Sequence, residues 1–292
     1  MILGVELRDD ATLAVVADDR GEIVARSERA GADAGAAAEA VGAVTAGIAV
    51  TAAGVAAFDP LDTGVADLIA AVSRAAGTTG RPRVVTRGGA VALAECWRGA
   101  ATGGRIVAVL SAADRITAGL VADGRLFEGA HGTAGAAGWL ALNPVEREDY
   151  RRQGCLAAEI STAGIVRRLV WRIKSGDESR ALDMAGGHLA AITMEHVFDA
   201  ARAGDGVAIS VVRDTARYIG MAIANIVVLA DPDTVLLGGL IAEAADLLLQ
   251  PSHAEAQRRL PGDMAARVAV AAAVLGADGG PLGAARAAML PQ

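Results

Sequence analysis

RIVAVLSAADRITAGLVADGRLFEGAHGTAGAAGW, residues 105–139, is the stretch around which the chain is organised. It begins with a strand, a tight turn and a second strand, and a turn at Asp123-Gly124 leads into a third strand. The part that starts at Gly129 is too rich in glycine to form a core element. The pattern therefore predicts a three-strand meander followed by a glycine-rich loop.

Residues 2–26, ILGVELRDDATLAVVADDRGEIVAR, repeat this plan at the start of the chain. With one residue deleted, Gly21 also falls on Gly124. Two similar meanders about a hundred residues apart predict a duplicated α/β domain with a cleft between its halves. The matched pairs are Ile2 with Ile106, Val5 with Val109, Val16 with Leu120, and Asp19 with Asp123.

The composition indicates a large core of small aliphatic side chains. Of the 292 residues, 53% are hydrophobic but only 3% are aromatic, so Ala, Val, Leu and Ile must fill the core. A chain of this length most naturally forms two domains. The net charge of −7, with a pI near 5.2, argues against nucleic-acid binding through the overall field.

The cysteines and the first residues indicate a cytoplasmic protein. Cys96 and Cys155 are too few for a disulfide framework or a four-thiolate zinc site. Strand residues follow Met1 directly, so no signal peptide is expected. Residues 40–58 carry no charge and are about long enough to cross a bilayer. Because Ala, Gly and Thr dominate them, the preferred interpretation is the end of a helix and a buried strand at 47–50, with a membrane span as the alternative.

Strands alternate with helices after each meander, which predicts an α/β fold. Gly103-Gly104 is the candidate hinge between an N-terminal domain, residues 1–103, and a C-terminal domain, residues 104–282. The last helix, residues 283–289, is expected to pack back on the first domain. The other expected elements are helices at 33–44, 65–76, 88–101, 157–174, 194–203 and 207–229, and strands at 2–7, 12–17, 22–26, 83–86, 234–237 and 268–272.

Four segments, in order, resemble the ROK family of repressors, open reading frames and sugar kinases. RPRVVTRGGAVALAECWRGAA, residues 81–101, is similar to the family segment ending in Glu-x-Trp-x-Gly-Ala, and GAHGTAGAAGW, residues 129–139, resembles its sugar-contacting loop. Residues 202–239 are similar to its long helix, Asp-Pro turn and adenosine-side glycine pair, and residues 275–289 to its final strand and helix. The resemblance implies an actin-like, sugar-kinase fold of two ribonuclease-H-like domains, usually a dimer.

The resemblance places Arg87 where a family kinase has its general base, an aspartate. A guanidinium cannot accept a proton at physiological pH, so this chain would lack the base. The family asparagine two residues later, which holds sugar hydroxyls, is Gly89. Arg87 is then either a solvated turn residue or the partner of an acidic neighbour or an anionic ligand.

The family's first phosphate turn, Asp-x-Gly-Gly-Thr, is here Glu-Leu-Arg-Asp-Asp at residues 6–10. Glycines that let backbone amides approach phosphates have become Arg8 and Asp9, and a carboxylate at that place would repel ATP. Two interpretations are open: a hydrated hairpin tip, or a metal cluster of Glu6, Asp9 and Asp10.

The sugar loop, the second phosphate turn and the zinc knuckle have also changed. The second turn, residues 113–117, has lost its glycines. The Cys-x-Cys-Gly-x-x-Gly-Cys knuckle falls on residues 148–155 and keeps only Cys155, so no zinc is expected. The loop lacks both the sugar-binding carboxylate and the zinc histidine, and its tryptophan is expected to fill the void they leave. Its degenerate positions are Gly135, Ala136, Gly138 and Trp139.

Gly238-Gly239 is the glycine pair that faces adenosine in the family, and it is equally a tight strand-to-helix turn. Because the base, the phosphate turns, the sugar carboxylate and the zinc ligands have all changed, the expected function is a regulatory or ligand-sensing homologue of the family's sugar kinases and repressors, without kinase activity. ATP with Mg²⁺ is a cofactor only if kinase activity persists.

The expected partners are a second copy of the chain and a small-molecule ligand. No winged helix-turn-helix precedes Ile2, so direct DNA binding is not expected. Two alternatives stay open. One is an ATP-dependent sugar kinase in which Asp114 or Glu95 is the base, and the other is a purely structural dimer subunit.

Overall fold

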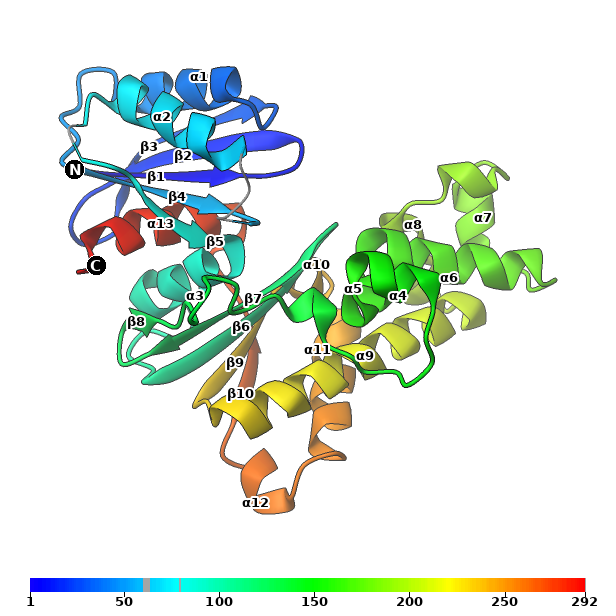
Figure 1. Cartoon of the computed structure of the whole chain (residues 1–292). Helices are drawn as coiled ribbons and strands as arrows, with labels where there is room; N and C mark the ends of the chain where they lie inside the picture. The colour runs from blue at the N-terminus through cyan, green and yellow to red at the C-terminus, as the bar shows by residue number, and fades with distance from the viewer. Residues whose placement is uncertain (60–63, 79, 292) are drawn as a thin grey trace. The chain divides into compact units, whose positions relative to one another are not determined.

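The computed structural model describes residues 1–59, 64–78 and 80–291 (Figure 1). It contains two five-stranded sheets, with strand orders β3-β2-β1-β4-β5 and β10-β9-β6-β7-β8. Reversing the second order gives β8-β7-β6-β9-β10, so each sheet places its meander and its two later strands in the same way. The α/β fold and the duplication expected from the two meanders are therefore confirmed.

The first sheet is mixed, because β1 pairs antiparallel with β2 and parallel with β4. In both sheets the meander strands come first in the chain and the remaining strands follow after helices. The strands of the first sheet are β1 (Ile2–Leu7), β2 (Ala11–Ala17), β3 (Ile23–Ala30), β4 (Ala52–Ala57) and β5 (Arg83–Thr86). Those of the second are β6 (Ile106–Ala112), β7 (Ile116–Ala122), β8 (Arg125–Leu126), β9 (Thr234–Gly239) and β10 (Ala269–Ala272).

The chain forms two compact units. The first comprises residues 1–109, 118–135 and 273–292, and the second comprises residues 110–117 and 136–272. The chain therefore passes between the units four times. A hinge at Gly103-Gly104 remains a prediction.

In the first unit, helices cover both faces of the first sheet (Figure 1). Helices α1 (Ala34–Thr45) and α2 (Gly64–Ala76) lie over one face, and α13 (Gly279–Met289) lies on the other, against β1 and β4. Helix α3 (Arg87–Arg98) packs against α13. The core beneath α1 and α2 consists of aliphatic side chains, as the composition predicted. It includes Leu3, Val5, Val16, Val41, Val55, Ile69 and Val72.

Two glycines let α13 lie directly on the backbone of the sheet. Gly4 and Gly54 are opposite each other in the parallel pairing of β1 with β4. A β-carbon at Gly4 would lie 1.8 Å from the Pro281 carbonyl oxygen, and one at Gly54 would lie 1.9 Å from the Ala284 carbonyl oxygen. Larger residues at either position would push the helix off the sheet.

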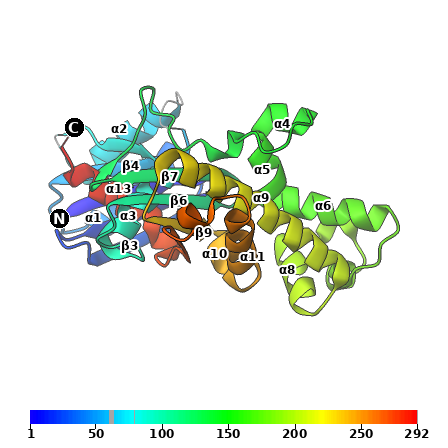
Figure 2. The same cartoon turned by 90° about the horizontal axis from the view of Figure 1, so that it is seen from below.

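In the second unit, the long helix α9 (Gly206–Ala230) contacts α5, α6, α8 and α11, and Figure 2 shows it beside them. Asp205 caps its start by accepting a hydrogen bond from the Ala208 amide at 2.7 Å, and Asp231 ends it in the left-handed region at φ 43°. The other helices are α4 (Glu148–Gln153), α5 (Cys155–Ile160), α6 (Thr162–Lys174), α7 (Arg180–Met184), α8 (Met194–Arg202), α10 (Leu240–Glu243), α11 (Ala245–Gln257) and α12 (Gly262–Ala265).

Two expected elements were placed wrongly. The strand expected at 47–50 lies at 52–57, because Gly47 takes a positive φ of 74° after α1 and the strand register sets Gly54 beside Gly4. The helix expected at 157–174 is broken at Ser161, whose hydroxyl accepts a hydrogen bond from the Gly164 amide at 3.2 Å and so starts α6.

The uncharged residues 40–58 are divided between the end of α1, a turn and β4. Over the described ranges, none of the helices combines the length and the apolar character needed to cross a membrane.

Candidate functional site

Glu6, at the end of β1, is a buried carboxylate held by two guanidinium groups. Its Oε1 accepts a hydrogen bond from Arg87 Nε at 3.0 Å. Its Oε2 accepts bonds from Arg8 Nε at 3.0 Å and Arg8 Nη2 at 2.8 Å. Arg8 Nη2 also donates to the Ala277 carbonyl at 2.9 Å, which joins the turn to the segment before α13. Both oxygens of the carboxylate are therefore engaged.

Local sequence explains why Arg87 lies there. Thr86 ends β5 and caps α3, since its hydroxyl accepts a hydrogen bond from the Gly89 amide at 3.1 Å, so Arg87 is the first residue of the helix. Gly88 is required by close packing, because a β-carbon there would lie 2.2 Å from the Ala118 carbonyl oxygen. The structure thus pairs Arg87 with an acidic neighbour, one of the interpretations that the sequence left open.

The acidic turn after β1 does not form a metal cluster with Glu6. The Glu6 carboxylate is occupied by the two arginines, and the described part of the chain contains no group of three or more side chains placed to hold a metal ion. Asp9 and Asp10 lie exposed at the tip between β1 and β2. The hydrated hairpin tip is the interpretation that fits.

The sugar-loop glycines are used in close backbone packing. Gly135 takes a φ of 90°, and its carbonyl accepts a hydrogen bond from the Ala118 amide at 2.7 Å. Gly138 is buried in a short 3-10 turn, η1 (Ala137–Trp139), whereas Ala136 before it is exposed. The prediction that Trp139 fills a void is wrong, since the residue is 57% exposed. The bends at Gly135 and η1 direct this side chain outward instead.

Gly238-Gly239 ends β9 and leads into α10. Gly239 takes a φ of 61°, and a β-carbon there would lie 2.2 Å from the Ala112 carbonyl oxygen. The turn and the close approach of the neighbouring strand are therefore enough to require glycine at 239, without any contact to adenosine. An adenosine contact at this pair stays a prediction.

The two alternative bases differ in availability. Glu95, on α3, is fully buried. Its carboxylate accepts hydrogen bonds from the backbone amides of Ala100 at 2.8 Å, Val274 at 2.8 Å and Leu275 at 2.9 Å. A carboxylate enclosed in this way cannot meet a substrate hydroxyl, so Glu95 as a base is wrong. Asp114 lies exposed in the turn between β6 and β7.

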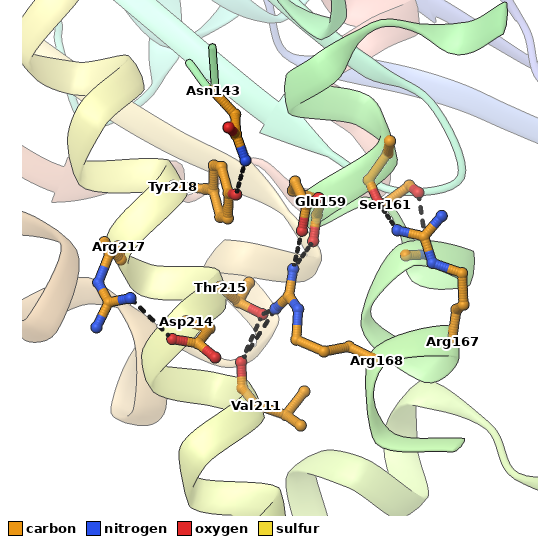
Figure 3. Close-up of polar contacts among 12 residues, drawn as sticks. Asn143, Glu159, Ser161, Arg167, Arg168, Val211, Asp214, Thr215, Arg217 and Tyr218 are labelled. Atoms are coloured by element: carbon orange, nitrogen blue, oxygen red, sulfur yellow. Dashed lines mark hydrogen bonds and ion pairs between the residues drawn. The ribbon is translucent and has the colours of Figure 1, made fainter. Parts of the chain in front are cut away.

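Another buried carboxylate, Glu159, was missed from the sequence. It lies on α5 and is held by Arg147, Tyr150 and Arg168. Figure 3 shows its contact with Arg168. The signal was present in the sequence, because CLAAEI is an apolar helix with a single charge. A charge on a buried helix requires a partner, and arginines occur at 147 and 168.

Comparisons with known proteins agree with the four motifs. A sequence model of the ROK family matches residues 22–290. A glucokinase of Halalkalibacterium halodurans is 35% identical over 201 residues, 66% of this chain and 58% of that protein. The DNA-binding transcriptional dual regulator NagC of Escherichia coli is 32% identical over 133 residues, 45% of this chain and 31% of that protein. The aligned regions thus span less than two thirds of these curated relatives.

A solved structure resembles the whole chain. It is the crystal structure of a ROK family glucokinase from Streptomyces griseus in complex with glucose and AMPPNP. Its TM-score is 0.82 at 25% identity, and the alignment covers 98% of both chains.

Proposed function

Because this chain belongs to the ROK family and has its sugar-kinase fold, we propose that it is a regulatory or ligand-sensing member that binds a small molecule without phosphorylating it. The proposal includes a cytoplasmic homodimer that needs no metal or nucleotide for folding. Direct nucleic-acid binding by these residues is not part of it.

The observation that carries the proposal is the ion pair of Arg87 with Glu6. Arg87 stands where the resemblance implies a general base, and its guanidinium has no lone pair with which to accept the proton of an attacking hydroxyl. The carboxylate nearest to it cannot take over this role while both of its oxygens accept hydrogen bonds from Arg8 and Arg87. A proton acceptor is therefore missing at the point where transfer would begin.

The first turn adds a second obstacle to phosphate transfer. Arg8 and Asp9 stand where glycines would let backbone amides approach a phosphate, and Glu6, which precedes them, is neutralised within the protein. A magnesium ion bound at this carboxylate would have to displace two guanidinium groups. These changes disfavour Mg-ATP in addition to removing the base.

One relative supports the regulatory half of the proposal. NagC is named as a DNA-binding transcriptional dual regulator, so the relatives of this chain include a regulator as well as a glucokinase. The match covers only part of that protein, and the ligand of this chain must be found by experiment.

The second candidate function is an ATP-dependent sugar kinase with an atypical site. The observation that favours it is the 35% identity with a glucokinase. It would need another base, and of the two carboxylates considered only Asp114 is exposed.

A thermal-shift screen followed by a transfer assay separates these functions. The purified chain is heated with glucose, N-acetylglucosamine, hexose phosphates, or ATP with and without Mg²⁺, and each hit is tested for transfer of phosphate from ATP. A shift with one small molecule and no transfer is the expected result. A joint shift with sugar and Mg-ATP, together with transfer, supports the kinase. No shift with any compound supports a structural dimer subunit.

A further inference from the structure

The segment that corresponds to the family's zinc knuckle is fastened by a polar network centred on Glu159. Glu159 Oε1 accepts hydrogen bonds from Tyr150 Oη at 2.6 Å and from Arg147 Nη1 at 2.8 Å. Glu159 Oε2 accepts one from Arg168 Nη2 at 2.6 Å. We name these four residues, Arg147, Tyr150, Glu159 and Arg168, the Glu159 network.

The network reaches helix α9 through one guanidinium group (Figure 3). Arg168 Nη1 donates to Thr215 Oγ1 at 3.0 Å and to the Val211 carbonyl at 3.3 Å, both on α9. Arg168 Nη2 also donates to the Glu159 carbonyl at 2.8 Å. Because Arg168 itself lies on α6, this side chain joins α5, α6 and α9.

The same network reaches back to the chain before α4. Asn143 Nδ2 donates to Tyr150 Oη and Tyr218 Oη, each at 3.3 Å, and Tyr218 lies on α9. Arg147 Nε donates to Asp149 Oδ1 at 3.0 Å, and Arg167 on α6 also pairs with Asp149. Residues 143–150 are thus tied to three helices by side-chain bonds alone.

The residues at this place do not fit a zinc ion. Cys155 is buried and packs with Tyr150, Ala158 and Leu142 in an apolar cluster. Zinc takes four thiolate, imidazole or carboxylate ligands, and in the described residues no three such side chains converge. The Glu159 carboxylate, the one buried anion nearby, already has three side-chain donors.

The segment held by the Glu159 network also supports the sugar loop. Gly154, between α4 and α5, takes a φ of 94°, and a β-carbon there would lie 2.2 Å from the Gly138 carbonyl oxygen. A β-carbon at Gly138 would lie 3.2 Å from that of Ala157 on α5. With so little clearance, a shift of the α4–α5 corner must move η1.

We infer that the Glu159 network is a metal-free cross-link that takes the place of a structural zinc and positions the loop residues 136–142. Four side chains close the contacts between the segment before α4 and helices α5, α6 and α9. The ion pairs can do so because Glu159 is shielded from water, with a side-chain exposure of 5%.

The test combines elemental analysis with hydrogen exchange on the full chain. Glu159→Gln removes the buried charge, and Glu146→Gln is the matched control, because Glu146 is in the same segment but pairs with Arg151 at the surface. We expect no stoichiometric zinc in the purified protein. We expect exchange in residues 136–155 to rise about tenfold in Glu159→Gln, with little change in the control or in wild type treated with EDTA.

Peptides from β1 to β4 serve as the internal reference, because a local role leaves their exchange unchanged. Zinc at one ion per chain, or exchange in 136–155 that is the same in Glu159→Gln as in wild type, would overturn the inference. A rise confined to regions outside 136–155 would overturn it as well.

A milder variant keeps the inference testable if Glu159→Gln does not fold. Tyr150→Phe removes the hydrogen bond that the hydroxyl donates to Glu159 and those that it accepts from Asn143 and Arg147, but it keeps the ring in its apolar cluster. In a background where Trp97 and Trp171 are phenylalanine, Trp139 fluorescence reports on the loop directly. We expect Tyr150→Phe to change the Trp139 emission and to raise loop exchange about threefold. An unchanged emission with unchanged exchange would overturn the positioning role.

Discussion

Two buried glutamates, Glu6 in the first unit and Glu159 in the second, are each paired with two arginines, yet their surroundings differ. Their side chains are 4% and 5% exposed, so the two carboxylates are equally shielded. The arginines of Glu6 come from a turn and from the first residue of a helix. At Glu159, Tyr150 donates a further hydrogen bond to the carboxylate. Arg168 also donates to the Thr215 hydroxyl and to the Glu159 backbone carbonyl.

The difference indicates that the same kind of interaction, a buried carboxylate paired with two arginines, has a different role in each unit. Around Glu159 the bonds connect the segment before α4 with helices α5, α6 and α9. Around Glu6 the bonds fill a place where the family resemblance implies a base and a phosphate, with exposed Asp9 and Asp10 beside it. We therefore expect the Glu6 cluster to affect phosphate transfer and the Glu159 cluster to affect stability.

The largest expected effect is that of Glu159→Gln on stability. Removing the charge leaves Arg147 and Arg168 without their buried partner, which should lower the free energy of unfolding by about 3–5 kcal/mol. Urea denaturation monitored by circular dichroism measures the loss. Glu146→Gln should change stability by less than about 0.5 kcal/mol. Equal losses in the two variants would contradict a special role of the network.

Glu6→Gln should cost less, about 1–3 kcal/mol. Glu6 accepts hydrogen bonds from two side chains, whereas Glu159 accepts them from three, so fewer donors lose their charged acceptor. The same urea series measures this variant. A loss as large as that of Glu159→Gln would remove the distinction between the two clusters.

Tyr150→Phe should have a smaller effect, about 1 kcal/mol. It removes one short hydrogen bond to Glu159 and leaves the ion pairs in place. Combined with Arg147→Met in a double-mutant cycle, it should show coupling of about 0.5 kcal/mol or more, since both side chains bond the same oxygen. Strict additivity would show that these bonds act independently.

The smallest expected effect is on the loss of stability at acidic pH. Burial alone would raise the pKa of the Asp149 carboxyl, but hydrogen bonds from Arg147 and Arg167 hold that pKa below its ordinary value of 3.8. A depressed folded pKa gives stability that is present above pH 3.8 and is lost as the pH falls through the folded value.

Asp149→Asn should therefore lower stability modestly at neutral pH, where the charged carboxylate contributes, and make the decline of stability in acid less steep. Urea midpoints measured from about pH 7 to about pH 3 test this expectation. A variant whose stability declines with acid as steeply as that of wild type would show that Asp149 does not contribute.

The sequence predicted the architecture well because the architecture rests on local patterns. Both meanders, the α/β alternation and the helices α2, α8 and α9 follow from periodicity and turn residues. The strand at 52–57 was missed because its position depends on the contact of Gly54 with α13, far away in the chain. The break at Ser161 was missed because a capping serine looks like any helical serine when read alone.

The candidate site was only partly predictable. Sequence motifs identified Arg87 and the altered turn, but the choice of Glu6 as the partner required the fold, since the two are 81 residues apart. The prediction of Glu95 as a base was wrong because three backbone amides enclose its carboxylate. Ala100 is near it in the sequence, but Val274 and Leu275 are brought to it only by the fold. The Glu159 network combines residues from four segments, and no single motif contains it.

The most direct test of the central claim is a measurement of phosphate transfer from radiolabelled ATP to glucose and N-acetylglucosamine, with Mg²⁺ and high concentrations of the protein. The account predicts product no faster than the reaction without protein, because Arg87 provides no base and Glu6 is held by two arginines. A kcat in the usual enzymatic range of about 1–10³ s⁻¹ would contradict it and show that another carboxylate acts as the base.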